Sequence, residues 1–218
     1  MVVVLLGPPG VGKGTQATRL ADGIAAEHVS TGDLLRAARR DGTDLGKKAQ
    51  DYMDAGEYVP DELVLDLVRG HFAGISAHAH VLFDGFPRTT AQATGLDSVL
   101  KSIGRQVHTV VVFEAPDETL VKRLSGRRSC PNCGAVYNTY LSPPVTEGVC
   151  DRCGGALVHR ADDEPDTVKR RLEVYREQTA PLVAFYEQHS ARLERVAADR
   201  SVDDVYADFA SGVGVVAA

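Results

Sequence analysis

The sequence predicts an α/β protein with a parallel sheet that is covered by helices on both faces. Two observations support this prediction. Short apolar runs typical of buried strands alternate with helical patterns along the chain, and a glycine-rich turn joins the first such run to the first helix. With 218 residues the chain is long enough to bury the core of one large domain that carries insertions.

The expected strands are continuous in β-branched and aliphatic residues, as strands buried on both faces are. The first is Val2–Leu6, and a shorter candidate lies near His28 and Val29. The other strands are expected at 80–83, 107–113 and 193–197. Helical patterns occupy 13–25, 31–40, 45–54, 61–72, 89–102, 117–125, 167–189 and 202–209.

Two stretches interrupt this alternation. Residues 126–162 contain all four cysteines together with several Gly and Pro, and they begin and end at helical patterns, so we expect an insertion outside the core. Residues 30–59 form a second, smaller excursion that is helical. The core domain is then expected to consist of 1–29, 60–125 and 163–218.

The charge balance restricts the possible partners. Lys and Arg number 24 and Asp and Glu number 30, which gives a net charge of −6 and argues against general binding to nucleic acid or to an anionic membrane. No apolar run has the length of a transmembrane helix, and Val2–Leu6 is too short for the core of a signal peptide. Four cysteines are too few for a disulfide scaffold, so we expect a reducing compartment and a cytoplasmic protein.

The glycine-rich turn "GPPGVGKGT" (7–15) fits the phosphate-binding loop pattern, with Thr15 shifted by one position. Glycines allow successive N–H groups to point inward at phosphate oxygens, and the helix that follows adds its positive end. Lys13 supplies a charge for the β- and γ-phosphates. A chance glycine-rich turn is the alternative, but the motif requires a buried strand before it and a helix after it, and both are expected here.

Asp84 ends the expected strand in "VLFDG". A carboxylate at the end of a strand beside a phosphate loop typically holds Mg²⁺ through water, although Asp is also common in helix caps and turns. The phosphate loop in the same chain favours magnesium.

The cysteines form two Cys-x-x-Cys pairs, Cys130 with Cys133 and Cys150 with Cys153, separated by sixteen residues. This spacing is typical of zinc sites, and four thiolates leave no position open at a tetrahedral ion, so the metal is expected to be structural. Disulfides are disfavoured by the compartment, and a redox motif would need only one pair.

Several motifs together resemble those of adenylate kinases, a family of nucleoside monophosphate kinases. They are "GPPGVGKGTQ" (7–16), "STGDLLR" (30–36), "DAGEYVPDELV" (54–64), "LFDGFPRT" (82–89), "GRR" (126–128), "RADDEPDTVKRRL" (160–172) and Y-x₅-PL (175–182). The resemblance covers nearly the whole chain and implies a five-stranded parallel sheet with two mobile lobes. Residues 30–59 would be the AMP-binding lobe, residues 126–162 a zinc-bearing lid, and the protein a monomer.

The resemblance also implies the site residues. The residues that would bind AMP are Thr31, Arg36, Glu57, Tyr58, Val59, Gly85, Phe86, Pro87, Arg88, Gln92, Arg160 and Arg171. The residues that would bind ATP are Gly10, Val11, Gly12, Lys13, Gly14, Thr15, Arg127, Val136, Tyr137 and Arg200. The residues that would act in catalysis are Lys13, Arg88, Arg123, Arg160 and Arg171.

Some of these assignments have alternatives. Gln92 is expected to recognise the adenine edge, because an amide both donates and accepts. Arg171 lies on a polar helix where an arginine is commonly solvated, and Arg128 and Arg170 fit that solvated role better. Arg200 is assigned loosely, because "VAADRS" (196–201) stands where the family usually has an Asp-Gly or Asn-Gly turn.

The implied reaction is the reversible, Mg²⁺-dependent transfer of the terminal phosphoryl group of ATP to AMP. It gives two ADP and maintains the balance of adenine nucleotides. The second pKa of the attacking phosphate lies near 6, so the reaction needs no general base, and none of the seven histidines needs a catalytic role. The arginines would neutralise charge and assemble only when the lobes close.

Two rival hypotheses remain open. Within the same class, the chain could phosphorylate another monophosphate or use GTP as the donor. From another class, it could be a zinc-ribbon ATPase that binds nucleic acid through Arg127, Arg128 and Arg152, although the net acidity and the "DGFPR" motif speak against this.

Overall fold

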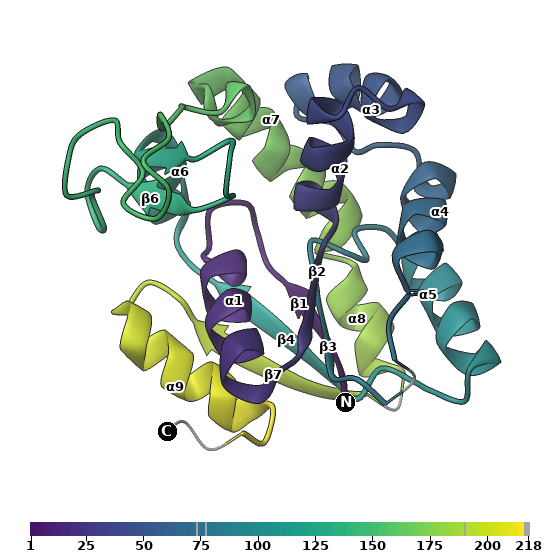
Figure 1. Ribbon diagram of the computed structural model, residues 1–218. Coiled ribbons are helices and arrows are strands. Elements are labelled where there is room, and N and C mark those ends of the chain that lie inside the picture. The colour runs from purple at the N-terminus through teal and green to yellow at the C-terminus, as the bar shows by residue number, and fades with distance from the viewer. Residues whose placement is uncertain (73, 77, 190, 216–218) are drawn as a thin grey trace.

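The computed structural model describes residues 1–72, 74–76, 78–189 and 191–215 (Figure 1). Its centre is a five-stranded sheet in the order β2-β3-β1-β4-β7, and all neighbouring strands are parallel. The α/β class and the five strands are therefore confirmed. The strands are β1 (Val2–Leu6), β2 (Glu27–Ser30), β3 (Val81–Asp84), β4 (Thr109–Glu114) and β7 (Arg192–Ala197).

Helices cover both faces of the sheet, as the alternating pattern predicted. The helices are α1 (Lys13–Ile24), α2 (Thr31–Arg40), α3 (Asp44–Asp54), α4 (Asp61–Phe72), α5 (Thr90–Ser102), α6 (Asp117–Ser125), α7 (Pro165–Val174), α8 (Leu182–Glu187) and α9 (Val202–Gly212). One hydrophobic cluster joins the sheet to α1, α6, α7 and α9, and the other joins it to α2, α3, α4, α5 and α8.

The first strand shows why the buried strands are apolar without interruption. Val2, Val4 and Leu6 belong to one cluster, whereas Val3 and Leu5 belong to the other, and all five side chains are at most 1% exposed. Successive side chains on a strand point to opposite faces, so a sheet covered on both sides has no polar face.

The helical pattern predicted over 167–189 is not one regular helix in the structure. Helix α7 ends at Val174, a π-helical turn spans Tyr175–Thr179, and α8 begins at Leu182. The N–H of Ala180 donates to the carbonyl of Tyr175 at 2.9 Å, a step of five residues. Pro181 explains the interruption, because proline has no N–H and its ring clashes with the carbonyl four residues earlier in a regular helix. The other predicted elements agree with the observed ones to within three residues at each end, and several agree at both ends.

The two insertions lie at the same end of the molecule. Residues 126–162 form a separate antiparallel pair, β5 (Arg127–Ser129) with β6 (Val136–Asn138), followed by loops. In Figure 1 this pair lies at the upper left, α2 and α3 lie at the upper right, and α7 lies between them. A single-turn 3₁₀ helix, Ala161–Asp163, leads into α7.

Among the described residues, no helix is both long and apolar enough to cross a membrane.

Candidate active site and metal centre

The phosphate loop lies between β1 and α1, at the carboxyl edge of the sheet, where parallel α/β proteins bind their ligands (Figure 1). Gly10 and Gly12 have φ values of 82° and 106°, which favour glycine. A Cβ atom on Gly10 would lie 2.7 Å from Cγ of Leu124, so close packing also requires glycine there. No side chain caps α1 at Gly12, and the first N–H groups of the helix therefore suit an anion.

The ammonium of Lys13 is held within this loop. Its Nζ donates to the carbonyl oxygens of Gly7 at 2.6 Å and Pro8 at 3.1 Å. Burial lowers the pKa of Lys13 to about 8, and the positive charges of Arg88, Arg171 and Arg127 act in the same direction. Three predicted phosphate-binding arginines are thus close enough to Lys13 to affect its charge.

Asp84 lies at the end of β3, beside the phosphate loop. A Cβ atom on Gly14 would lie 3.1 Å from Oδ2 of Asp84, and Nε2 of His28 lies 3.5 Å from the same oxygen. Burial by itself would raise the pKa of Asp84, but His28 and the charge of Lys13 hold it below its ordinary value. A charged carboxylate at this strand end is compatible with Mg²⁺ held through water, and that role of Asp84 stays a prediction.

A fully buried carboxylate, Asp163, organises two of the predicted arginines. Arg127 donates to both of its oxygens, from Nε at 2.7 Å and from Nη2 at 2.5 Å. Arg171 donates from Nη1 to Oδ1 of Asp163 at 2.9 Å and to the carbonyl oxygen of Asp162 at 2.7 Å. The side chain of Arg171 is 19% exposed, so the alternative of a solvated Arg171 is wrong.

Arg160 and Arg36 extend this cluster. Nε of Arg160 donates to Oγ of Ser129 at 2.7 Å, and Nη2 of Arg36 donates to Oδ1 of Asp33 at 2.6 Å. Burial lowers the pKa of Arg160, and the positive charges of Arg127 and Arg36 lower it further. Because these charges repel one another, a polyanion bound among them would relieve the repulsion.

Arg88 is held by contacts with Gly85, with Tyr58 and with Thr179 of the π-helical turn between α7 and α8. Its Nε donates to the carbonyl of Gly85 at 2.7 Å, and its guanidinium carbon lies 5.0 Å from the ring centroid of Tyr58. Oγ1 of Thr179 donates to the carbonyl of Arg88 at 2.8 Å and lies 2.8 Å from the hydroxyl of Tyr58. The π-helical turn therefore carries Thr179 to the site.

Gln92 and Thr31 lie next to this arginine. The carbonyl oxygen of the Gln92 side chain accepts from the N–H of Arg88 at 2.8 Å, and its Nε2 donates to Asp61 at 2.7 Å. The amide is therefore bonded at both ends, and recognition of adenine by Gln92 stays a prediction that must use its remaining lone pair or N–H. Oγ1 of Thr31 donates to the carbonyl of Gly85 at 2.7 Å.

Arg170, which was expected to be solvated, connects two elements of the site. Its Nε donates to Oε1 of Glu57 at 2.6 Å, so α7 is joined to the segment that precedes α4. Among the residues that the structure describes, Arg128 donates only to the backbone, to the carbonyls of Ser125 and Arg127.

The remaining predicted site residues are Arg123, assigned to catalysis, and Arg200, Val136 and Tyr137, assigned to ATP binding. Nη1 of Arg123 donates to the carbonyl of Val11 in the phosphate loop at 3.0 Å. The guanidinium of Arg200 is bonded to Asp208 of α9 and to the carbonyl of Ala197. Val136 is half exposed, and the hydroxyl of Tyr137 points to the cysteines.

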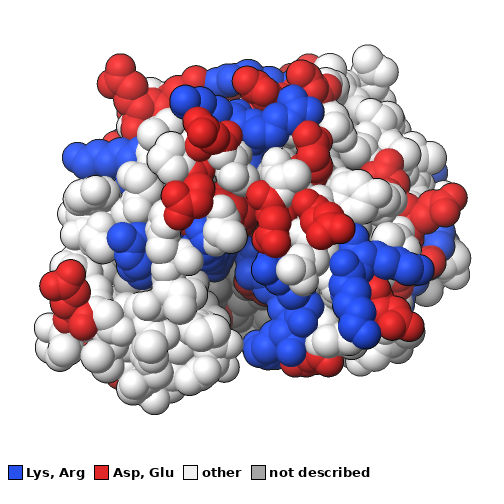
Figure 2. All heavy atoms as spheres, turned by 90° about the horizontal axis from the view of Figure 1, so that it is seen from above, with Lys and Arg blue, Asp and Glu red and all other residues white. Residues whose placement is uncertain are grey.

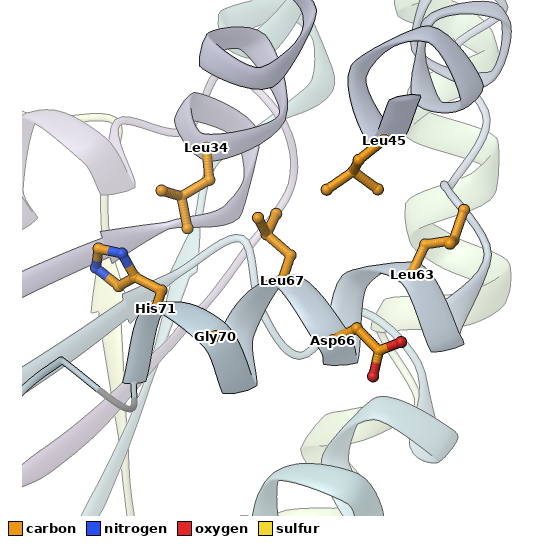
Figure 3. Close-up of a pocket in the computed structure, with 7 residues that line it drawn as sticks. All are labelled: Leu34, Leu45, Leu63, Asp66, Leu67, Gly70 and His71. Atoms are coloured by element: carbon orange, nitrogen blue, oxygen red, sulfur yellow. The ribbon is translucent and has the colours of Figure 1, made fainter. Parts of the chain in front are cut away.

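Seen from above, the surface at this end is hollowed, and Lys and Arg side chains gather beside and inside the hollow (Figure 2). A separate pocket with a volume of about 530 Å³ lies between α2, α3 and α4 (Figure 3). None of the residues that line it is a predicted site residue. They are Leu34, Leu45, Leu63, Asp66, Leu67, Gly70 and His71.

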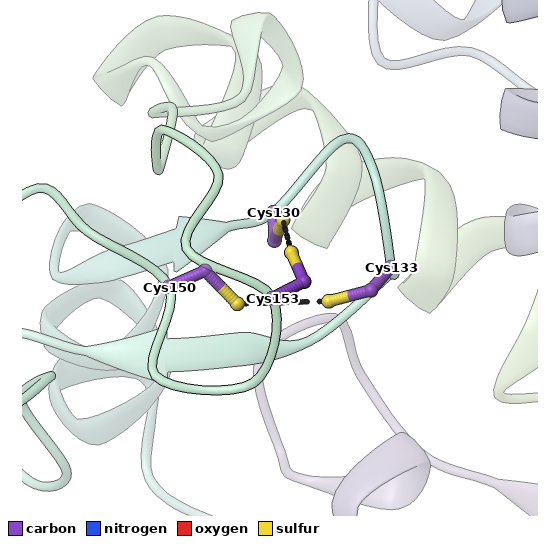
Figure 4. A group of neighbouring side chains, drawn as sticks. All are labelled: Cys130, Cys133, Cys150 and Cys153. Atoms are coloured by element: carbon purple, nitrogen blue, oxygen red, sulfur yellow. Dashed lines mark hydrogen bonds between the residues drawn. The ribbon is translucent and has the colours of Figure 1, made fainter.

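The four cysteine sulfurs converge, as their spacing predicted (Figure 4). All lie within 4.8 Å of one another, with 3.4 Å between those of Cys130 and Cys153 and 3.6 Å between those of Cys133 and Cys150. A tetrahedral zinc with Zn–S bonds of ~2.3 Å separates its sulfurs by about 3.8 Å. The group of four cysteines, called the cage below, therefore fits zinc. The distances between its sulfur atoms are much too long for disulfide bonds.

The sequence did not point to several residues of this site. They are His28, Asp61, Asp162, Asp163 and Thr179. Of these residues, only Asp162 and Asp163 could have been found from the sequence, because they lie between Arg160 and Arg171 in "RADDEPDTVKRR".

Comparison with known proteins agrees with this geometry. The family model described as adenylate kinase matches residues 5–191. The adenylate kinase of Lachnospira eligens is 47% identical over 207 residues, covering 95% of this chain and 97% of the relative. That of Caldicellulosiruptor bescii is 50% identical over 186 residues, covering 85% and 86%. That of Bacillus pumilus is 45% identical over 214 residues, covering 98% of each. The chain therefore belongs to the adenylate kinase family of phosphotransferases.

Proposed function

We propose that this chain transfers the terminal phosphoryl group of ATP to AMP, reversibly and with Mg²⁺, and so maintains the balance of adenine nucleotides. The observation that supports this most directly is the set of arginines around Lys13, two of which Asp163 holds in place. Transfer between two polyphosphates requires little covalent chemistry from the protein, and it depends on positioning and on neutralising charge.

The site divides naturally between a donor and an acceptor. The phosphate loop with Lys13 would hold the phosphates of ATP, and Arg88 with Arg36 would hold the phosphate of AMP. Arg127, Arg160 and Arg171 would bind the phosphates between them. Arginine suits this role because its planar group donates two parallel hydrogen bonds to phosphate.

The attacking oxygen of AMP needs no base, because the second pKa of a phosphate monoester lies near 6. The protein must instead align the two phosphates and exclude water. Mg²⁺, held through water by Asp84, would neutralise charge on the transferred phosphoryl group.

We also propose that residues 30–59 and 126–162 act as an AMP-binding lobe and a lid that close over the substrates. Their contacts support this division. Nη1 of Arg40 in α2 donates to the carbonyl of Pro131, next to the first cysteine, at 3.4 Å. Glu57 meets Arg170 of α7, and Asp33 lies near enough to Arg160 for its pKa to be affected by that arginine. Arg36 of the first segment and Arg160 of the second are therefore close enough for their charges to interact. Movement of the two segments apart would separate these arginines.

The decisive experiment measures ADP formed from ATP and each of AMP, CMP, UMP and GMP, with and without Mg²⁺. We expect two ADP for each ATP consumed with AMP, and little ATP turnover when the monophosphate is omitted. A preference for UMP or CMP would refute the AMP assignment. ATP hydrolysis that ignores every monophosphate would refute phosphoryl transfer altogether.

A further inference from the structure

Tyr137 and Val136 face opposite sides of the small β5–β6 sheet. Val136 pairs with Ser129, and Tyr137 pairs with Arg128. Paired residues share a face and successive residues do not, so Val136 lies on the face of Ser129. Oγ of Ser129 accepts from Arg160, and that face therefore belongs to the arginine cluster. Tyr137 points the other way, to the cysteines.

The hydroxyl of Tyr137 has two partners, and both lie in the segment from Cys150 to Cys153. Its oxygen accepts from the N–H of Asp151 at 2.9 Å and lies 3.6 Å from Sγ of Cys150. Because the oxygen already accepts the backbone N–H, the hydroxyl proton is free to be donated to the sulfur. A metal-bound thiolate carries no proton and can only accept.

This contact distinguishes Cys150 from the other three cysteines. In the part of the chain that the structure describes, Tyr137 is the only hydroxyl within hydrogen-bonding distance of a cysteine sulfur. Cys150 is also 1% exposed, so water cannot readily replace the donor. Removal of the hydroxyl would leave a buried thiolate with one donor fewer.

We propose that Tyr137 is a positioning residue of the metal site, whose hydroxyl donates to the thiolate of Cys150 and strengthens the binding of zinc. A donated hydrogen bond stabilises the negative charge that a metal-bound sulfur carries. Partners of this kind also orient the ligand, and their loss typically costs 10–100-fold in metal affinity. Through the same contact, the cage holds β6, the strand on which Val136 faces the arginine cluster.

The test compares the full-length wild type with Tyr137→Phe, and with Tyr140→Phe as the matched control. Tyr140 lies in the same insertion and is 60% exposed. Zinc affinity is measured by competition with a chromogenic chelator. We expect Tyr137→Phe to bind zinc about 10-fold or more weakly and Tyr140→Phe to match the wild type. Equal affinity of Tyr137→Phe and the wild type would overturn the proposal.

A second measurement separates a hydrogen bond from simple packing. In the cobalt-substituted protein, loss of a donor to the thiolate should shift the thiolate-to-metal charge-transfer band to longer wavelength. Replacement of Tyr137 by 3-fluorotyrosine, a stronger donor, should shift the band to shorter wavelength. If both substitutions leave the band of the folded, loaded protein unchanged, the hydroxyl does not donate to the sulfur and the proposal fails.

Discussion

The phosphate loop and the cysteine-bearing insertion, 126–162, are stabilised in opposite ways. The phosphate loop follows a strand that is completely buried, and Gly10 packs against Leu124. The insertion has little apolar core. Its buried residues are chiefly Ser129, Cys130 and Cys150, whereas many of its large apolar side chains are exposed. These are Val136, Tyr140, Leu141, Val145, Val149 and Val158.

Because of this difference, we expect the phosphate loop and the insertion to lose their structure independently of each other. The sheet and its two clusters position the phosphate loop whether or not a metal is bound. About forty residues without a core depend on the metal instead, because a closed four-thiolate site supplies the free energy that apolar burial does not. The arginines at the two ends of the insertion, Arg127 and Arg160, depend on that site.

The largest effect is expected at Lys13. In Lys13→Met the phosphate loop keeps its shape but loses its charge, and kcat/KM for phosphoryl transfer should fall by about 10²–10³-fold. The thermal unfolding temperature should stay close to that of the wild type, because packing holds the loop. Lys101→Met, at the exposed end of α5, is the control. Activity near that of the wild type would refute the assignment of the loop.

Asp163→Asn should have the next largest effect. It tests the contact between Arg127 of the insertion and Arg171 of the core, which both bind Asp163. The substitution leaves Arg127 without its buried counter-charge and leaves Arg171 with Asp162 alone, which should destabilise the protein by about 3 kcal/mol. Denaturant unfolding measures this loss. Asp166→Asn, whose side chain is fully exposed, should cost much less. Equal losses in the two variants would mean that Asp163 does not organise the arginines.

Removal of the metal should act on the insertion alone. After chelation, backbone amides of 127–158 should lose protection in hydrogen exchange, while those of β1 and β4 keep theirs. Cys130→Ser should act in the same direction and mainly lower the thermal stability of the insertion. Complete loss of activity without a change in unfolding temperature would contradict a structural metal.

The smallest expected effect is the dependence of ATP affinity on pH. The pKa of Lys13 is about 8 without nucleotide, and phosphate binds its charged form. Above pH 8, binding must therefore be accompanied by uptake of a proton, and ATP affinity should fall by up to about 10-fold per pH unit. Calorimetry at pH 9 in two buffers of different ionisation enthalpy measures this uptake. Lys13→Arg, which stays charged, should remove it, and a wild type without proton uptake would contradict the lowered pKa.

The sequence by itself determined the features that depend on neighbours along the chain. The β-branched runs and helical periods predicted the α/β class, and the fixed spacings of the phosphate loop and of Cys130, Cys133, Cys150 and Cys153 predicted their chemistry. These patterns are local or consist of short local pieces, such as the two Cys-x-x-Cys pairs, because backbone conformation and ligand geometry restrict residues a few positions apart.

Only the tertiary structure decided which charges are buried and which partners they have. Arg171 and Arg170 are adjacent on one polar helix, yet Arg171 meets the buried Asp163 and Arg170 meets Glu57. Strand pairing turns the hydroxyl of Tyr137 to Cys150, and contact between Tyr137 and ATP stays a prediction. In each case the partner lies outside the residue's own helix or strand, and burial there sets the free energy of the charge or hydrogen bond.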